Sequence, residues 1–329
     1  VSTTEAGFAA HLRWGPAETR VLVTSEDDLI ADFQKPLTSN TATDFFVASN
    51  FLAYGNALFI TRVINTSTSG GTALNATVSN NAVASTVVKN DDDYDDNYST
   101  GISGIGAWVA KYPGELGNSL KVSVCPSSNA FESTITANVT VTDGSKTVTG
   151  VTTEANGAGV AASAFSTELK VGDLLVLGPD QFIGKIASIA NNSSLTLESK
   201  YLGNTVSAFS TQTSHNASVS TPTRRWEFFS NVDRAPTTSE YANTAGGSGD
   251  ELHIVVADED GEWTGVKNTV LETFENLSVA SDAKNEDGST NFYKEVINQQ
   301  SRYLYWAAHD FKTNAGNKAS GVTFSGDGL

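Results

Sequence analysis

The residues of this chain best suited to chemistry are its clustered acids. Asp91-Asp92-Asp93-Tyr94-Asp95-Asp96 places five carboxylates in six positions, and Asp258, Asp260 and Glu262 alternate along the chain. Carboxylates are ligands for hard divalent cations, but the acidic run lacks the alternating spacing, the glycine and the closing glutamate of an EF-hand loop. We therefore interpret Asp91–Asp96 as a solvated acidic loop and Asp260-Gly261 as hairpin chemistry.

The other residue types that catalyse reactions or bind ligands are scattered. Gly144-Ser145-Lys146-Thr147 carries the end of a phosphate-binding loop without its upstream glycine, which favours a hairpin turn. The single cysteine, Cys125, excludes an intrachain disulfide and follows apolar residues, so we expect a buried, unreactive thiol. The histidines show no spacing at which two of them would hold one metal ion. They are His11, His215, His253 and His309. The sequence thus predicts no catalytic, cofactor-binding or metal-binding residues, and no enzyme.

The composition restricts the partners. The net charge of −17, from 20 basic and 37 acidic side chains, opposes binding to nucleic acid or to an anionic membrane surface. No apolar run approaches the roughly 20 residues of a membrane-spanning helix. Charged residues make up 17% of the chain, against a usual value of about 25%. Ser, Thr and Asn fill the difference, as is common in β-rich extracellular and virion proteins.

The first 65 residues have an α/β pattern. Ser25, followed by three acids, is an N-cap for a helix that ends before Pro36. Thr41 or Thr43 is predicted to cap a second helix, which ends at Gly55. Apolar residues cover most of the circumference of this second helix, so we expect it to be buried. Leu58 to Ile64 then reads as a buried strand.

Two segments look like insertions. Residues 66–106 are acidic and rich in Asn, Ser and Gly, which predicts a hairpin or loop with little core. Residues 135–222 contain short β-prone runs separated by turn signals such as Asp143-Gly144 and Asn191-Asn192. Such a pattern is typical of a small β-barrel or sandwich, here inserted into a surface loop.

Helical and strand patterns return after Pro222. Leu252 to Ala257 reads as a buried strand, and Tyr303 to Ala307 as another. Val270, Phe274 and Leu277 share a helical face. Phe292 and Val296 mark a further helix, with its cap near Ser289 or Thr290. The predicted fold is therefore an α+β or α/β multidomain protein, in which a mixed α/β sandwich domain (1–65, 107–134 and 223–329) is interrupted by the two insertions.

Three turn motifs stand out from this framework: Leu12-Arg13-Trp14-Gly15-Pro16, Asn50-Phe51-Leu52-Ala53-Tyr54-Gly55-Asn56 and Tyr112-Pro113-Gly114-Glu115-Leu116-Gly117-Asn118. Each places Gly, Pro or Asn at a turn or cap, beside aromatic residues that we expect to be buried. In this order they resemble the contractile tail sheath proteins of myovirus-type bacteriophages. The residues that carry the resemblance are Trp14, Gly15, Pro16, Asn50, Tyr54, Gly55, Asn56, Tyr112, Pro113, Gly114, Glu115 and Gly117.

The resemblance extends over Phe8–Asn65, Tyr112–Val124 and about Glu251–Ala308. It implies a structural virion protein, made in the host bacterial cytoplasm. Its subunits would stack as helically arranged hexameric rings around a tail tube and contract on a baseplate trigger, without a cofactor. The implied partners are further copies of the subunit, the tail tube and the baseplate proteins.

The chain departs from the family pattern at both ends. It starts at Val1 without a methionine and stops at Gly328-Leu329. The resemblance therefore predicts a fragment that lacks the family's N-terminal arm and C-terminal domain, and that is a soluble monomer.

Two other classes of protein stay open. A Ser/Thr/Asn-rich adhesin that binds carbohydrate would share the composition, although two capped helices and buried strands around an insertion are unusual for that class. A secreted glycoside hydrolase would need a pair of carboxylates, and no such pair stands out.

Overall fold

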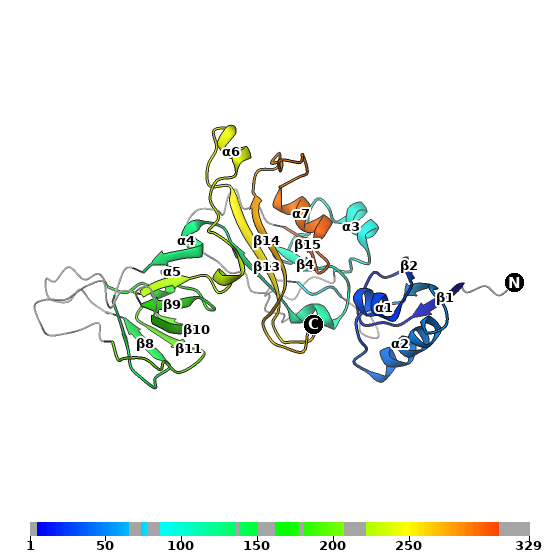
Figure 1. Cartoon of the computed structure of the whole chain (residues 1–329), viewed down its shortest axis with the longest axis horizontal. Helices are drawn as coiled ribbons and strands as arrows, with labels where there is room; N and C mark the ends of the chain where they lie inside the picture. The colour runs from blue at the N-terminus through cyan, green and yellow to red at the C-terminus, as the bar shows by residue number, and fades with distance from the viewer. Residues whose placement is uncertain are drawn as a thin grey trace, which may run out of the picture.

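The computed structural model describes residues 5–65, 74–77, 86–135, 138–150, 162–177, 181–206 and 222–308. Figure 1 shows these residues as an elongated molecule with three parts. We call residues 5–65 the N-terminal unit, at the right of the figure, and the seven-stranded sheet at the left the β insert. The central unit lies between them and contains the long β13–β14 hairpin. The described residues contain helices together with several separate sheets, which agrees with the predicted multidomain α+β class.

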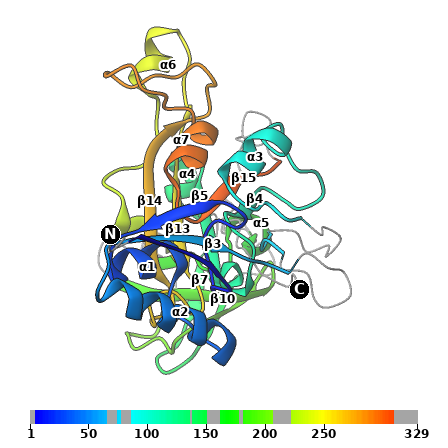
Figure 2. The ribbon, with the colours of Figure 1, turned by 90° about the vertical axis from the view of Figure 1, so that its right-hand side faces the viewer.

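The N-terminal unit contains a three-stranded sheet with the strand order β1-β3-β2. Its strands are β1 (Glu5–Ala10), β2 (Arg20–Val23) and β3 (Ala57–Arg62), and its helices are α1 (Glu26–Phe33) and α2 (Ser39–Leu52). As predicted, Ser25 caps α1: its hydroxyl accepts the backbone N–H of Asp28 at 3.1 Å. The cap of α2 is Thr38, not Thr41 or Thr43, and α2 ends at Leu52, before Gly55. In Figure 2, which brings this unit to the front, both helices lie on the same side of the strands.

The prediction that the second helix is buried is wrong. Phe45 and Ala48 of α2 face the core, but Phe46 is 57% exposed and Val47 is 51% exposed. The reason is that α2 packs against one sheet and α1 only, and no further layer of described residues covers its outer side. Apolar residues around a helix therefore do not by themselves require a second packing partner in this part of the chain.

The acidic run is a helix rather than a loop, which corrects the prediction for Asp91–Asp96. Helix α3 (Asp91–Asn97) begins at Asn90, whose side-chain oxygen accepts the backbone N–H of Asp93 at 2.9 Å. Acids in the first turn of a helix are stabilised by its dipole. Tyr94 is 1% exposed and stacks on Tyr305, with ring centroids 4.1 Å apart. Since Tyr94 joins a buried cluster, the described part of residues 66–106 also has more core than predicted.

The central unit surrounds a sheet with the order β14-β13-β5. Its strands are β5 (Leu120–Cys125), β13 (Glu251–Asp258) and β14 (Thr269–Ser278), and β4 (Trp108–Ala110) pairs with β15 (Leu304–Trp306) beside it. Every residue of β13 is buried, as predicted for Leu252 to Ala257. Alternate residues of β13 enter two different apolar clusters, so this sheet is covered on both faces.

The predicted helical face of Val270, Phe274 and Leu277 is wrong, because these residues lie in strand β14. Phe274 pairs with Ile254 and Leu277 with Leu252, and two register shifts interrupt the antiparallel ladder. The apolar spacing of a bulged strand imitates a helical period, and only the pairing with β13 reveals the strand. The later helix, α7 (Tyr293–Gln300), is present, but it begins after Phe292 rather than after Ser289 or Thr290.

The β insert is one sheet with the order β6-β12-β9-β10-β11-β8-β7. The first half of β10 (Gln181–Asn191) pairs with β9 (Leu174–Leu177), and its second half pairs with β11 (Ser194–Leu197). The outer strands β6 (Glu132–Thr134) and β7 (Val139–Val141) do not pair with each other, so the described residues form no closed barrel.

The remaining elements of the whole chain are β8 (Thr147–Gly150), β12 (Pro222–Arg225), α4 (Ser128–Phe131), α5 (Phe165–Glu168), η1 (Glu115–Ser119), η2 (Phe229–Asn231) and α6 (Glu240–Thr244). Of these, β8 and β12 belong to the sheet of the β insert.

Buried ion pairs lie within the β insert and between it and the central unit. Arg224 lies 2.6 Å from Asp173, and both side chains are at most 5% exposed. Lys121 of β5 lies 2.7 Å from Glu227, and the same carboxylate oxygen is 3.4 Å from Lys185 of β10. A buried charge that loses its partner is strongly destabilising. The Arg224–Asp173 pair therefore holds β12 beside β9, and the contacts of Glu227 with Lys121 and Lys185 fix the insert against β5 of the central unit.

Candidate functional site

The guanidinium of Arg62 lies where two of the three turn motifs meet. It is 3% exposed, and it donates hydrogen bonds to four backbone carbonyl oxygens. Nε reaches Leu12 at 2.8 Å and Nη1 reaches Gly15 at 2.8 Å. Nη2 reaches Pro113 at 2.7 Å and Arg13 at 3.4 Å. Burial lowers the pKa of Arg62 to about 10, so the group is still charged at neutral pH. We call this arrangement the Arg62 hub.

Glycine is required at two positions of the hub. Gly15 has a φ of +100°, and a Cβ there would lie 2.6 Å from the carbonyl oxygen of Asp32. Gly114 has a φ of +137°, and its Cβ would lie 3.1 Å from the carbonyl oxygen of Arg13 and 3.3 Å from Nη2 of Arg62. An L-residue at either position is strained by the backbone and by these contacts. The two glycines therefore allow the two turns to approach the same guanidinium.

Trp14 links the N-terminal unit to the central unit through its ring. It is 3% exposed and makes edge contacts with Tyr112 at 5.5 Å and with Trp263 at 4.8 Å between ring centroids. Gly117 lies beneath it, and a Cβ on Gly117 would meet the Cβ of Ala110 at 2.9 Å. Aromatic pairs in this geometry add about 0.5–1.5 kcal/mol beyond their buried area.

The other motif residues beside the hub differ in exposure. Pro113 is buried, Pro16 and Tyr112 are half-buried, and Glu115 is exposed at the start of η1.

The Asn50–Asn56 motif does not join this hub. It forms the end of α2 and the turn into β3, where the backbone N–H of Gly55 bonds to the carbonyl of Phe51 at 2.8 Å. Asn50 and Asn56 are exposed, and Tyr54 is 94% exposed. The expectation that the aromatic residues beside the motifs are buried is thus wrong for Tyr54.

Sequence reasoning missed the role of Arg62, although Arg62 ends the predicted strand. The available signal was a lone cation at the inner end of an apolar strand, since such a charge needs partners when it is buried. The partners are backbone carbonyls, which no residue type reveals.

An ion pair 2.5 Å long between Arg13 and Glu262 adds a second link to the β13–β14 hairpin.

The alternating acids of the hairpin have separate partners. Asp258 is fully buried and accepts the hydroxyl of Ser119 at 2.7 Å and the backbone N–H of Thr264 at 2.8 Å. Burial acts to raise the pKa of Asp258, but these donors outweigh it and hold the pKa below its ordinary value. Asp260 approaches Lys267 at the surface. The described residues contain no group of three or more acids, histidines or cysteines placed to hold a metal ion.

The other candidates are also engaged in the fold. His253 is fully buried, with Nε2 2.8 Å from the carbonyl of Arg234 and Nδ1 accepting the backbone N–H of Asn276 at 3.0 Å. Cys125 is buried as predicted, and burial raises the pKa of its thiol to about 12. His11 lies at the surface of the hub's turn, and His215 and His309 fall outside the described residues.

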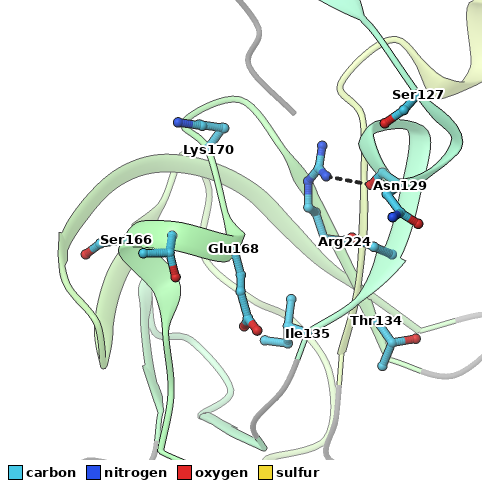
Figure 3. Close-up of a pocket in the computed structure, with 10 residues that line it drawn as sticks. Ser127, Asn129, Thr134, Ile135, Ser166, Glu168, Lys170 and Arg224 are labelled. Atoms are coloured by element: carbon cyan, nitrogen blue, oxygen red, sulfur yellow. Dashed lines mark hydrogen bonds between the residues drawn. The ribbon is translucent and has the colours of Figure 1, made fainter. Parts of the chain in front are cut away.

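A cavity of about 650 Å³ lies between α4 and the β insert, and Figure 3 shows the residues that line it. Hydroxyl and amide side chains line it, together with Ile135, Glu168, Lys170 and Arg224, and no lining residue is aromatic. Arg224 is fully engaged: besides Asp173, it donates to the carbonyls of Asn129 at 3.0 Å and Ala130 at 2.6 Å. The cavity therefore offers no unpaired guanidinium to a ligand.

The buried polar groups of this region hold turns and junctions of the described residues together. No helix among the described residues is long and apolar enough to cross a membrane. No protein-family model matches the chain.

The chain is 26% identical over 324 residues to the tail sheath protein of Salmonella phage ViI. This alignment covers 89% of this chain and 44% of the relative. It is 39% identical over 111 residues to the tail sheath protein of Vibrio phage KVP40, which covers 33% of this chain and 16% of the relative. It is 43% identical over 67 residues to the tail sheath protein of Enterobacteria phage T4. This alignment covers 20% of this chain and 10% of the relative.

The chain is thus a relative of the phage tail sheath proteins, and it spans less than half the length of those relatives. A solved structure, the sheath tail protein Lin1278 of Listeria innocua, aligns with 61% of this chain and 33% of that chain at 14% identity, with a TM-score of 0.20. A superposition this poor supports no conclusion about the fold.

Proposed function

We propose that this chain is part of a subunit of a contractile tail sheath. In this proposal the full protein polymerises around a tail tube and contracts to drive the tube through the host envelope for genome delivery. The observation that carries the proposal is the alignment with a tail sheath protein over 89% of the chain. The two further relatives, at higher identity over shorter stretches, support the same role.

The second part of the proposal concerns the extent of the chain. We infer that it is one part of a sheath subunit, since it spans 44% of the length of the phage ViI relative. We further propose that 66–106 and 135–222 are insertions into the sheath framework. The separate apolar core of the β insert supports this division for 135–222.

The Arg62 hub has a role in such a subunit. A sheath subunit that transmits force must keep its parts in a fixed orientation, and a buried guanidinium bonded to four carbonyls is a stiff connection. We propose that Trp14, Gly15, Pro113 and Gly114 are sheath-motif residues because they build this connection. The role of Asn50, Tyr54 and Asn56 would differ, because these residues lie at the surface of the N-terminal unit.

The test uses the complete open reading frame that contains these 329 residues. We expect the purified product to form helical tubes in electron micrographs, whereas the 329-residue chain alone is a monomer by light scattering. A folded full-length product that forms no helical tubes, alone or with the tail tube protein encoded beside it, would overturn the sheath proposal. Rings or tubes formed by the 329-residue chain would overturn the fragment proposal.

A further inference from the structure

The β insert carries another hollow, which shares no lining residue with the cavity of Figure 3. It has a volume of about 330 Å³ and lies between the first half of β10, residues 182–185, and the segment 198–202 that follows β11. Both strands are labelled at the left of Figure 1. We call this hollow the β10 groove.

The two walls of the β10 groove are tied together. At one end, the side-chain amide of Gln181 donates a hydrogen bond to the hydroxyl of Tyr201, which in turn donates to the carbonyl of Asn204 at 2.8 Å. At the other end, Lys185 lies 3.3 Å from Glu198, and the backbone N–H of Glu198 bonds to the carbonyl of Lys185 at 2.9 Å. Since these links exist without a ligand, binding does not require the walls to become ordered.

Two exposed apolar side chains line the groove. Phe182 is 57% exposed and Leu202 is 83% exposed, whereas their sequence neighbours Ile183 and Tyr201 belong to the buried core of the β insert. Successive side chains of an extended segment point to opposite sides, so Phe182 and Leu202 point away from that core. Exposed apolar side chains that share one hollow are typical of a ligand-binding surface.

The charged side chains of the groove leave one positive charge unpaired. Lys185 lies close to two carboxylates, those of Glu198 at 3.3 Å and Glu227 at 3.4 Å. Lys200 is exposed and forms no ion pair with a described residue. The whole chain carries a net charge of −17, but salt screens the field of distant charges beyond about 8 Å at physiological ionic strength. The Lys200 ammonium therefore decides which charge the groove attracts.

We propose that the β10 groove binds a saccharide that bears a carboxylate, namely a uronic acid unit at the end of a saccharide chain. The carbon–hydrogen face of the sugar ring lies on the phenyl ring of Phe182 and against Leu202, which removes apolar surface from water on both partners. The carboxylate accepts charge-assisted hydrogen bonds from Lys200. Glu198 and Ser199, both exposed in the groove, bond to the sugar hydroxyls.

The dimensions and the polar groups of the groove favour this ligand over a peptide or a lipid. Its volume is at the lower end of the range of about 300–1,000 Å³ for small-molecule sites. The links at Gln181 and Glu198 limit its length to a few residues, which suits one compact sugar unit and not an extended peptide. A lipid tail would remove Lys200 from water without giving it a partner, which costs free energy.

The proposal concerns the β insert alone and does not depend on the sheath proposal. Saccharide binding and tube formation are measured separately, so either result can fail without the other.

Isothermal titration of the 329-residue chain with a tetrasaccharide of glucuronic acid tests the proposal. We expect saturable binding with a Kd of about 1 mM or tighter. The matching tetrasaccharide of glucose is expected to bind about ten times more weakly or less, because it offers Lys200 no carboxylate. Absence of binding of the acidic tetrasaccharide at about 10 mM overturns the proposal, and so does equal binding of the two tetrasaccharides.

Variants place the ligand in the groove. Phe182→Ala and Lys200→Gln are each expected to weaken binding of the acidic tetrasaccharide about ten-fold or more, without a change in Tm, since both side chains lie at the surface. Phe182→Tyr keeps the ring and is expected to keep the affinity. Val171→Ala and Lys170→Gln are the matched controls, because Val171 is 61% exposed on the same insert and neither residue lines the groove.

Two results with these proteins contradict the proposal. Unchanged affinity in Phe182→Ala or in Lys200→Gln would show that the saccharide binds elsewhere. Displacement of the tetrasaccharide by an equal concentration of sodium acetate would show a site for any small anion, without recognition of the sugar ring.

Discussion

Nη2 of Arg62 lies 2.7 Å from the carbonyl oxygen of Pro113, so the last residue of β3 is tied directly to a turn 51 positions further along the chain. The same side chain also bonds to Leu12 and Gly15, and all four of its acceptors among the described residues are backbone carbonyls. A charged donor bonded to carbonyls is stronger than a neutral one and is costly to remove from a buried site. The guanidinium is therefore one of the links that orient the N-terminal unit, beside the ring of Trp14 and the Arg13–Glu262 ion pair.

The first prediction concerns this guanidinium. Arg62→Lys is expected to lower the free energy of unfolding by about 2–4 kcal/mol, because one ammonium cannot reach carbonyls that lie around a planar fork. Urea unfolding followed by tryptophan fluorescence measures the loss. Arg225→Lys is the control: Arg225 forms a surface pair with Glu132, and its loss is expected to cost less than about 1 kcal/mol. Equal losses of unfolding free energy for the two substitutions would show that the buried Arg62 guanidinium stabilises the protein no more than a surface arginine does.

The second prediction tests the packing beneath Trp14. Gly117→Ala is expected to destabilise the protein by about 1–3 kcal/mol, since the new methyl group would lie 2.9 Å from Ala110 and 3.0 Å from Ala76. Gly7→Ala is the matched control, because nothing lies within 4 Å of its added Cβ. Thermal unfolding compares the two variants. A Gly117→Ala protein with an unchanged Tm would mean that the two turns are not closely packed.

The third prediction concerns pH. Burial lowers the pKa of His253 below its ordinary value of 6.5, so the unfolded chain takes up a proton before the folded protein does. Stability due to this group is therefore complete above about pH 7 and falls as the pH drops through 6.5 toward the lower folded pKa, by at most about 1.4 kcal/mol per pH unit.

The measurement for His253 is a difference between proteins. Urea unfolding between pH 7.5 and 5.5 is compared for the parent, His253→Gln and His11→Gln. The comparison between proteins is necessary because burial also raises the pKa values of Glu259 and Glu272. Stability due to these two carboxyl groups falls as the pH rises, whereas stability due to His253 increases. We expect a flatter profile for His253→Gln only. A parallel profile for all three proteins would contradict the assignment of His253 as a buried neutral ring.

The fourth prediction concerns Cys125. With its pKa raised to about 12, the thiol is almost entirely protonated at pH 8, and it is also inaccessible. We expect a disulfide reagent to react with it at least a hundred times more slowly in the native protein than in urea, where one thiol per chain should appear. Rapid reaction of the native protein would show that β5 opens readily.

Local chemistry was sufficient for some elements. Ser25 caps α1 because a side-chain oxygen followed by acids favours a helix start in any context. The wholly apolar run in β13 predicts a buried strand for a similar reason. The acidic helix α3 was missed although Asn90 and the acids after it form a local cap of the same kind, and its one buried side chain, Tyr94, is held by Tyr305, which lies far away in the sequence.

The sequence by itself determined the kinship, the start of α1, the buried strand β13 and the glycine-bearing turns, since each of these depends on residue types within a short stretch. Only the tertiary structure decided that the Trp14 turn and the Tyr112 turn share one guanidinium while the Asn50 turn lies apart, and that both helices of the N-terminal unit lie on the same side of its strands (Figure 2). The physical reason is that carbonyl partners and sheet faces are set by the path of the backbone, which no single residue type encodes.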